Sequence, residues 1–525
     1  MTDISKGPNT GLQEKKCVDN RWAIYGLTLA LSLILFFAHA ATNDILNDDG
    51  INYIYAAHAL SEGLLDEAEI YRPEVHFYRQ IVVISTLSGL DLYPSAHLLS
   101  LFWQILLAGG FIAIVRCFDT SIPSQLIALA VFFSMASLNH LRPDIIRGFG
   151  FWALQLWAIW AGLNFLKHKA WRFALLWLGF SVASILYRAE GIVYLLLIPL
   201  FTLFSAYFTG QLTTKTQLKI VGIILFTGAI AWLFLSPETK HSSSETYRPT
   251  QSVSFSAADK LQNEFTTLKL AAKNFDQLKD DIATLMPNKW AERSVNDLLI
   301  GGFIFHLLVT LLKTTNTPLM ILSLYRGDIK RPFLRGPQYT LLASYILMGI
   351  LIGLMSVYNK YFLSTRYIML TAILLAVPVT FMLSRSYSHF SASQQVPKRL
   401  WRYALCCLPL LACIYPLANQ NDGKLYIRDA GQWVKTHIDD SKKVYFDEQK
   451  VAFYTANYAN NSFKKRYDEL EDLIHAGYQY AVLHDRKAAG KQNPFQQRLQ
   501  KQRIATFENN QGRSVNVYKL PATDS

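Results

Sequence analysis

Charge and cysteine are both scarce in this 525-residue sequence. Lys, Arg, Asp and Glu together make up 17% of it, against about 25% in an average soluble protein. Hydrophobic residues make up 51%, which excludes a disordered or collagen-like chain and argues against a purely soluble enzyme. The five cysteines lie in no segment that we place outside the membrane and have no metal-ligand spacing with histidine, so we expect neither disulfides nor zinc.

Glycine-rich phosphate loops and internal repeats are also lacking. A net charge of +13 is common in proteins that bind nucleic acid. Here, however, most Lys and Arg residues lie in short segments between apolar runs, which is typical of membrane-topology signals. We therefore expect no nucleic-acid partner.

Long apolar runs dominate what is present. A helix needs about 20 apolar residues to cross a bilayer, because the hydrocarbon core is about 30 Å thick and each residue rises about 1.5 Å. The sequence contains about eleven such stretches, at residues 22–41, 95–115, 122–138, 149–166, 172–187, 191–208, 218–236, 298–325, 338–358, 367–384 and 403–419. The eighth is interrupted by Lys313 and Pro318, so it is either one tilted helix or a broken one.

The distribution of positive charge predicts the orientation. With the N-terminus in the cytoplasm, the short outer loops hold only Arg142, Arg147, Arg188, Lys360 and Arg366. Most other cations between the spans then lie inside, as the positive-inside rule requires. An odd number of spans places the C-terminus on the outer side.

The chain divides into a cytoplasmic segment 1–21, a membrane domain 22–419 and an outer domain 420–525. Two outer loops, 42–94 and 237–297, interrupt the membrane domain, and the second contains an amphipathic helical pattern from Ala257 to Met286. Ala38-His39-Ala40 also resembles a signal-peptidase site, and cleavage there would still leave the loop 42–94 outside.

The outer domain alternates strand and helix patterns. Strands are expected at 443–446, 480–483, 504–507 and 515–520, and helices at 427–438 and 468–475. The predicted fold class is therefore an α-helical polytopic membrane protein of about 11 transmembrane helices with a small α/β C-terminal extracytoplasmic domain.

Ionisable residues are rare inside the predicted spans, with His306 and Lys313 as the clearest exceptions. Transporters usually place such residues near the bilayer midplane. Here they gather at the outer ends of the spans, which favours an enzyme acting at the outer membrane surface on a substrate that arrives from the lipid.

The first outer cluster is acidic. Asn43-Asp44 and Asn47-Asp48-Asp49-Gly50 follow the first span directly. These acids either cap the next helix and complement its dipole, or one of them serves as a general base, because adjacent acids raise each other's pKa.

The other outer clusters are basic. Arg142, Asp144 and Arg147 share one loop. In one interpretation Asp144 caps the next helix and Arg147 reaches to the lipid headgroups. In the other the arginines bind a phosphate, and Asp144 orients them or holds a cation. Arg188 and Glu190 flank another turn and either pair with each other or join such a site. The remaining candidates are Lys360 and Arg366 before the tenth span, and Tyr71-Arg72-Pro73, His76, Tyr78 and Arg79 in the first loop, a stretch suited to sugar stacking.

Together these motifs resemble those of the GT-C membrane glycosyltransferases, which include the aminoarabinose transferase of lipid A, the protein O-mannosyltransferases and enzymes that glycosylate lipopolysaccharide. The family's first loop reads Asp-Glu with Tyr four residues after the Asp. Asp49 and Tyr53 keep this spacing, whereas Asp48 keeps the position of the first acid. Arg142-Pro143-Asp144 is similar to the family's Arg-x-Asp segment, and Arg188-Ala189-Glu190-Gly191 and Arg366-Tyr367 also have counterparts.

Two features depart from the family pattern. The second acid is Asp instead of Glu, and His76-Phe77-Tyr78-Arg79 stands near the place of the usual Pro-Pro-Leu or Pro-Pro-Tyr element. These departures concern the contacts to the donor headgroup more than the class of enzyme.

The resemblance implies an inverting transferase that moves a sugar from a polyprenyl-phosphate carrier to a lipid, glycan or protein acceptor, at the periplasmic face of a bacterial inner membrane. The implied roles are general base for Asp49 or Asp48; donor-phosphate binding for Arg188, Arg366, Lys360, Arg142 and Arg147; support for Asp144, Glu190 and Tyr53; and acceptor or sugar contact for His76, Tyr78 and Arg79. The resemblance implies no cofactor with certainty, and a divalent cation is the one candidate. The alternatives are a lipid-linked sugar flippase or transporter and a non-enzymatic envelope assembly protein.

Overall fold

The computed structural model describes most of the chain. The described residues are 20–42, 45–209, 213–235, 257–286, 289–324, 336–392, 407–415, 424–439, 441–456, 467, 469–485 and 498–521. Asn43 and Asp44 of the acidic cluster, the first part of the second outer loop and both ends of the eleventh predicted span lie outside the described residues.

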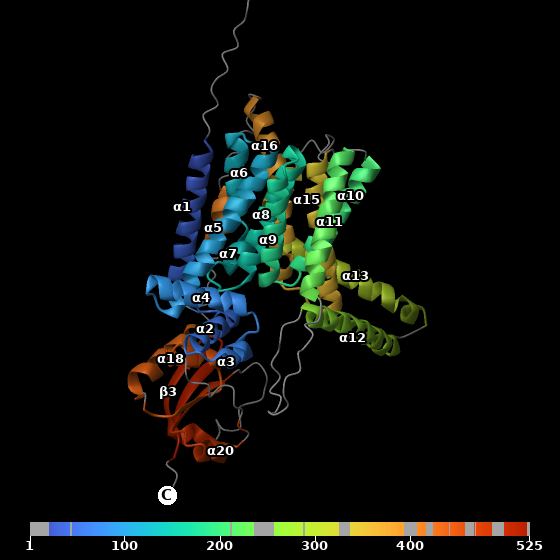
Figure 1. Cartoon of the computed structure of the whole chain (residues 1–525). Helices are drawn as coiled ribbons and strands as arrows, with labels where there is room; N and C mark the ends of the chain where they lie inside the picture. The colour runs from blue at the N-terminus through green and yellow to red at the C-terminus, as the bar shows by residue number, and fades with distance from the viewer. Residues whose placement is uncertain are drawn as a thin grey trace, which may run out of the picture.

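Long helices stand side by side and form the body of the molecule (Figure 1). They are α1 (Arg21–Thr42), α5 (Leu92–Phe118), α6 (Ile122–Phe133), α8 (Gly148–His168), α9 (Trp171–Tyr187), α10 (Gly191–Thr209), α11 (Thr214–Leu235), α13 (Lys289–Thr314), α15 (Pro337–Lys360) and α16 (Thr365–Ala392). Within the described residues, 6 helices are long and apolar enough to cross a membrane, and three shorter apolar helices accompany them. The expected polytopic membrane domain is confirmed.

The outward faces of these helices are apolar. Ile34 and Phe37 on α1, Leu175 on α9 and Phe305 on α13 all expose most of their side chains. Such a surface is unfavourable in water and favourable in hydrocarbon, so these faces are the ones that contact lipid.

Two predicted spans are broken. The third ends at Phe133, and a separate helix α7 (Ala136–Leu141) continues the chain toward the end of the bundle that the sequence predicts to face outward, which we name the outer end. The eighth divides at Thr315 and Asn316 into α13 and α14 (Thr317–Leu324). Pro318 falls in the first turn of α14, where a missing N–H breaks no intrahelical bond.

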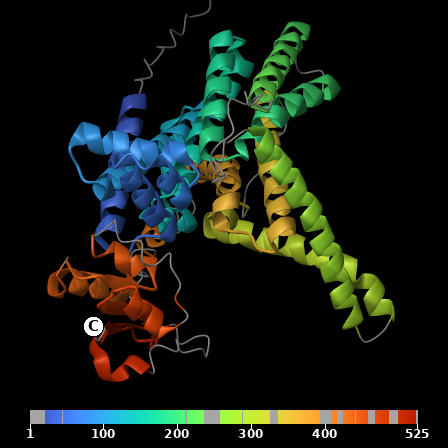
Figure 2. The same cartoon turned by 60° about the horizontal axis from the view of Figure 1, so that its bottom comes forward.

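Three short helices cover the outer end of the bundle: α2 (Asp48–Ser61), α3 (Leu65–Tyr71) and α4 (Val75–Ser88) (Figure 1). The amphipathic segment of the second outer loop is helical, as expected, and forms α12 (Ala257–Thr284). It lies across the direction of the spans, and together with α13 it reaches away from the bundle (Figure 2).

The C-terminal domain is a small mixed sheet with helices. Its strands β1 (Val444–Phe446), β2 (Tyr480–Asp485), β3 (Arg503–Glu508) and β4 (Ser514–Lys519) confirm all four predicted strands. The strand order is β1-β2-β4-β3, with β1 and β2 parallel and the other pairs antiparallel. The accompanying elements are α18 (Leu425–His437), α19 (Gln449–Phe453), α20 (Leu470–His475) and the 3₁₀ turn η4 (Gln500–Gln502), of which α18 and α20 confirm the two predicted helices.

This domain packs beneath α2–α4 (Figures 1 and 2). The Gln449 side chain donates to Asn52 Oδ1 at 2.7 Å, and the Leu46 backbone N–H donates to the Tyr454 hydroxyl at 2.8 Å. Phe453 joins the core of the membrane domain, where its ring lies 6.4 Å from that of Tyr55. The domain is thus fastened next to the first turn of α2.

Candidate active site

The acidic cluster forms the first turn of α2, where Asp48 and Asp49 complement the helix dipole. Asn47 precedes the helix but does not cap it with its side chain. Its Oδ1 accepts the Ile145 backbone N–H at 3.0 Å instead. Gly50 permits this approach, because a Cβ there would lie 2.7 Å from Asn47 Oδ1. The contact fastens α2 to the loop that contains Asp144.

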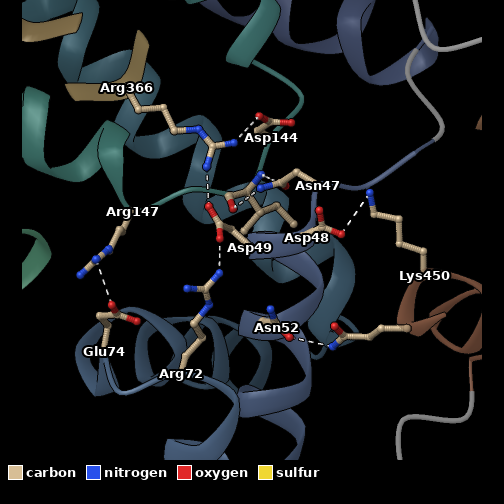
Figure 3. Close-up of polar contacts among 12 residues, drawn as sticks. Asn47, Asp48, Asp49, Asn52, Arg72, Glu74, Asp144, Arg147, Arg366 and Lys450 are labelled. Carbon is tan, nitrogen blue, oxygen red and sulfur yellow. Dashed lines mark hydrogen bonds and ion pairs between the residues drawn. The ribbon is translucent and has the colours of Figure 1, made fainter. Parts of the chain in front are cut away.

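Arg366 contacts two carboxylates, those of Asp49 and Asp144 (Figure 3). Its Nη1 contacts Asp49 Oδ2, and its Nη2 lies 3.2 Å from Asp144 Oδ2. Arg366 is in the first turn of α16, where the helix dipole disfavours a cation. The carboxylates offset that cost, so this guanidinium is held by charges from two other parts of the chain.

Asp49 has a second cationic partner (Figure 3). Arg72, which follows α3, contacts Asp49 Oδ1. The Arg72 guanidinium lies 5.0 Å from the centre of the Tyr53 ring. Burial raises the pKa of Tyr53 to about 12, so this side chain stays neutral beneath the cation. Arg72 appears in the predicted sugar-stacking stretch, but the sequence did not identify it as a partner of Asp49.

Arg142 positions the Asp144 loop from inside the bundle. Its side chain is 2% exposed, and its Nε donates to Asn139 Oδ1 at 2.7 Å. Its Nη1 donates to Gln104 Oε1 at 3.1 Å, and Gln104 Nε2 returns a bond to the Arg142 carbonyl at 2.9 Å. The structure therefore does not bring Arg142 to the outer surface with the other predicted phosphate ligands.

Asp144 lies next to this buried cluster. Burial raises the pKa of Asp144 to about 6, although Arg366 acts in the opposite direction. The carboxylate is therefore charged near neutral pH but protonates at mildly acidic pH.

A polar cavity of about 330 Å³ opens among these groups. Its lining residues are Ile45, Leu46, Asn47, Asp48, Asp49, His140, Asp144, Arg366, Lys424 and Lys450. The Asp48 side chain is 71% exposed and pairs with Lys450 at 3.0 Å, whereas that of Asp49 is 33% exposed. Both candidate bases thus face the same cavity, but only Asp49 is shared between arginines.

Arg188 and Glu190 form a separate pair. Arg188 Nη2 lies 2.7 Å from Glu190 Oε1, and the guanidinium lies 4.5 Å from the centre of the Tyr367 ring. Burial acts to raise the pKa of Glu190, but Arg188 outweighs it and lowers that pKa to about 2. Arg188 also donates to the Arg366 carbonyl at 3.4 Å, so the pair supports the start of α16.

Two further predicted phosphate ligands have other partners. Arg147 pairs with Glu74 at 2.9 Å (Figure 3). Lys360 is exposed and donates to the Tyr367 hydroxyl at 2.7 Å. Both lie at the outer end of the bundle, but neither lines the polar cavity.

The predicted sugar contacts on α4 are not brought to the cavity either. His76 and Arg79 are exposed on α4, and Tyr78 is fully buried in the core. The cavity does contain residues that sequence reasoning missed, namely His140, Lys424 and Lys450. Their only available signal was a basic or polar side chain in an outer segment, and for the two lysines that segment is a separate domain.

Comparison with known proteins identifies the fold. No family model and no curated protein matches the sequence. Among solved structures, ArnT from Cupriavidus metallidurans bound to undecaprenyl phosphate has a TM-score of 0.51 at 10% identity, with 95% of this chain and 98% of that chain covered. The oligosaccharyltransferase of Archaeoglobus fulgidus in complex with Zn and sulfate has a TM-score of 0.51 at 11% identity, with 88% and 67% covered. The chain therefore shares the fold of these two structures, in agreement with the fold that the resemblance to the GT-C membrane glycosyltransferases implied.

The zinc in the second structure raises the question of a metal here. Among the described residues, no group of three or more His, Cys, Asp and Glu side chains could hold a metal ion. Asp49 and Asp144 are close, but the Arg366 guanidinium stands between them. Among the described residues, the Arg366 guanidinium therefore lies where a cation bridging Asp49 and Asp144 would have to lie.

Proposed function

We propose that the protein is a membrane glycosyltransferase that transfers a sugar from a polyprenyl-phosphate carrier to an acceptor at the periplasmic face of a bacterial inner membrane. The observation that supports this most is the sharing of Arg366 between Asp49 and Asp144 in a polar cavity at the outer end of a GT-C bundle. In this proposal the lipid-linked phosphate and the acceptor hydroxyl meet beside this acid and this cation.

Asp49 is the proposed general base. A carboxylate has about four acceptor positions, so the contacts with Arg72 and Arg366 leave room for an acceptor hydroxyl. As the acceptor oxygen bonds to the sugar carbon C1, its proton passes to Asp49. The bond from C1 to the carrier phosphate breaks with its electron pair on the phosphate, and attack from the opposite face inverts C1.

Arg366 is the proposed phosphate ligand. A guanidinium offers paired N–H donors that match phosphate oxygens, and Arg366 is the arginine that lines the cavity. The other three arginines have structural roles in this proposal and do not touch the phosphate. Arg188 supports the start of α16, Arg147 pairs with Glu74, and Arg142 fixes the Asp144 loop. This division selects one phosphate ligand from the wider predicted set.

The test is carrier release by the purified full chain in nanodiscs. The protein is incubated with a panel of undecaprenyl-phosphate-linked hexoses and pentoses and with envelope extract as acceptor, and free undecaprenyl phosphate is measured by mass spectrometry. Loss of a general base typically costs 10²–10⁴-fold in rate, so we expect about a 10³-fold loss in Asp49→Asn. The neighbouring variant Asp48→Asn should lose less than about tenfold, because Asp48 contacts only Lys450 among the ion pairs of this site.

Three results would overturn parts of this proposal. Full activity in the Asp48→Asn/Asp49→Asn double variant removes the base assignment, and a larger loss in Asp48→Asn transfers the role to Asp48. Movement of intact donor across vesicle membranes without carrier release would favour the flippase alternative.

A further inference from the structure

A second cavity lies between the C-terminal domain and the start of α2. Its volume is about 570 Å³, within the range of small-ligand sites. The lining residues are Asp48, Lys424, Tyr426, Ile427, Glu448, Lys450, His484 and Arg513. Asp48, Lys424 and Lys450 line both cavities, so this domain cleft adjoins the candidate active site.

Cations are in excess in the domain cleft. Lys450 is paired with Asp48, and Glu448 lies 3.4 Å from the His484 ring. Within the described part of the chain, Lys424 and Arg513 form no ion pair although both line the cleft. With Lys450 they give the lining three cations against the two carboxylates of Asp48 and Glu448. This excess of positive charge in a concave site favours an anion, and Arg offers paired N–H donors that match the oxygens of a phosphate or carboxylate.

A second part of the lining, the wall formed by Tyr426, Glu448 and His484, is polar and held in place. The His484 side chain is 9% exposed, and its Nε2 lies 2.7 Å from the Tyr426 hydroxyl. The Asp447 carboxylate accepts the His484 backbone N–H at 2.9 Å. A hydroxyl both donates to and accepts from the hydroxyls of a sugar, a neutral imidazole has one donor and one acceptor nitrogen, and a carboxylate accepts.

The cleft has a fixed position relative to Asp49. The bonds from Gln449 to Asn52 and from Leu46 to Tyr454 tie its domain to α2 and to the residues just before it. Lys450 reaches from α19 to Asp48, one residue from Asp49 (Figure 3). A molecule bound in the cleft can therefore extend directly to the proposed base.

We propose that the domain cleft binds the acceptor, and that this acceptor is a sugar bearing a phosphate or carboxylate group. The role of this sugar as the acceptor rests on the proposed function, but its binding can be measured without any transfer. Lys424 and Arg513 contact the anionic group, and the wall formed by Tyr426, His484 and Glu448 contacts the sugar hydroxyls.

The experiment measures binding of glucose 6-phosphate and glucuronate to the full chain in nanodiscs by ligand-observed NMR, with glucose and inorganic phosphate as separate arms. Both anionic sugars should bind more tightly than either glucose or phosphate alone. Arg513→Gln and Lys424→Gln should each weaken that binding by about tenfold, as expected for loss of a charge-assisted contact. The matched control Arg498→Gln lies in the same domain, pairs with Glu471 and is 67% exposed, and it should bind like the wild type.

Several outcomes would overturn the proposal: equal binding of glucose and glucose 6-phosphate, equal binding of phosphate and glucose 6-phosphate, or unchanged binding in Arg513→Gln and Lys424→Gln. The two proposals fail separately. Asp49→Asn should lose carrier release yet retain glucose 6-phosphate binding. If the wild type binds the sugar phosphate but releases no carrier, and Arg513→Gln loses that binding, the transferase assignment fails and the anionic-sugar site stands.

Discussion

Two arginine–carboxylate clusters lie at the outer end of the bundle, and they differ in how charge is matched. Arg188 and Glu190 form a closed pair within one turn of the chain, and the pKa of Glu190 is lowered to about 2 by its partner. Arg366 is shared by Asp49 and Asp144, and burial raises the pKa of Asp144 to about 6. The first cluster is a single closed pair, whereas in the second Arg366 is shared by two acids, one of which, Asp49, also contacts Arg72.

This difference separates a stabilising pair from a candidate site. A closed pair gains little from a further anion, because its guanidinium already has a full partner. A shared guanidinium beside a cavity can exchange one carboxylate for a phosphate without leaving the site. Perturbed carboxyl pKa values next to a cavity are also typical of functional sites. The predictions below test this contrast.

The largest effect in the shared cluster is expected from Arg366. Arg366→Gln should lower kcat/KM for carrier release by about 10²–10³-fold, the usual cost of removing one charge-stabilising donor. Arg366→Lys should recover little, because an ammonium lacks the fork that reaches two acids. The matched control is Arg385→Gln, which lies on the same helix roughly 30 Å away and should retain wild-type release. Equal losses in both variants would mean that α16 is merely destabilised.

In the closed pair the expected effect is on stability. Arg188→Gln leaves Glu190 charged and without its partner, which costs about 3 kcal/mol when a largely buried pair is broken. The midpoint of thermal unfolding in detergent should fall for this variant and recover in part when Glu190→Gln is added. If Arg188→Gln instead unfolds like the wild type but loses undecaprenyl-phosphate binding, Arg188 is a phosphate ligand after all.

The raised pKa of Asp144 predicts that its contribution to stability grows as the pH falls, which is the reverse of the usual behaviour of a paired carboxylate. Its pKa rises from 3.8 to about 6 on folding, so the folded chain holds this proton more tightly than the unfolded chain does. The contribution of Asp144 to stability therefore increases as the pH falls from about 6 to about 4. At pH 7.5, Asp144→Asn should unfold at a higher temperature than the wild type, with a free energy of unfolding that is greater by at most roughly 3 kcal/mol. This difference in free energy should shrink toward pH 4. A constant difference across this range would contradict the raised pKa.

Much of the fold could be predicted from the sequence. Apolar length located the long helices, and short apolar stretches located all four strands of the outer domain. The break after Phe133 was not predicted, because Met135, Ala136 and Leu138 keep that segment largely apolar. In the eighth span, Lys313 and Pro318 left a broken helix as one of two alternatives, and the structure shows the break at Thr315 and Asn316. Hydrophobicity indicates that a segment enters the membrane, but not where its helix changes direction.

The site could be predicted only in part. Charge at the outer ends of the spans identified Asp49, Asp144 and Arg366, and the structure brings these three together. The pairing of Asp49 with Arg366 has no local signal, since 317 positions separate them. Arg142 was predicted to bind phosphate but lies inside the bundle. An arginine at the end of a helix can face either water or the bundle, and here hydrogen bonds to Gln104 and Asn139 hold it inside. The catalytic roles themselves remain predictions for the variants above.

The smallest effect is expected from Lys360, at the edge of the closed cluster. Its bond to the Tyr367 hydroxyl and its position 4.5 Å from that ring are exposed contacts, which are worth about 0.5–1 kcal/mol. Lys360→Met should therefore change KM for the lipid-linked donor by less than about threefold. Tyr367→Phe is the matched comparison, because it removes the hydroxyl while keeping the ring beneath Arg188. A tenfold rise in KM for Lys360→Met but not for Tyr367→Phe would show that Lys360 meets the donor phosphate, and the site would then extend from the shared cluster into the closed one.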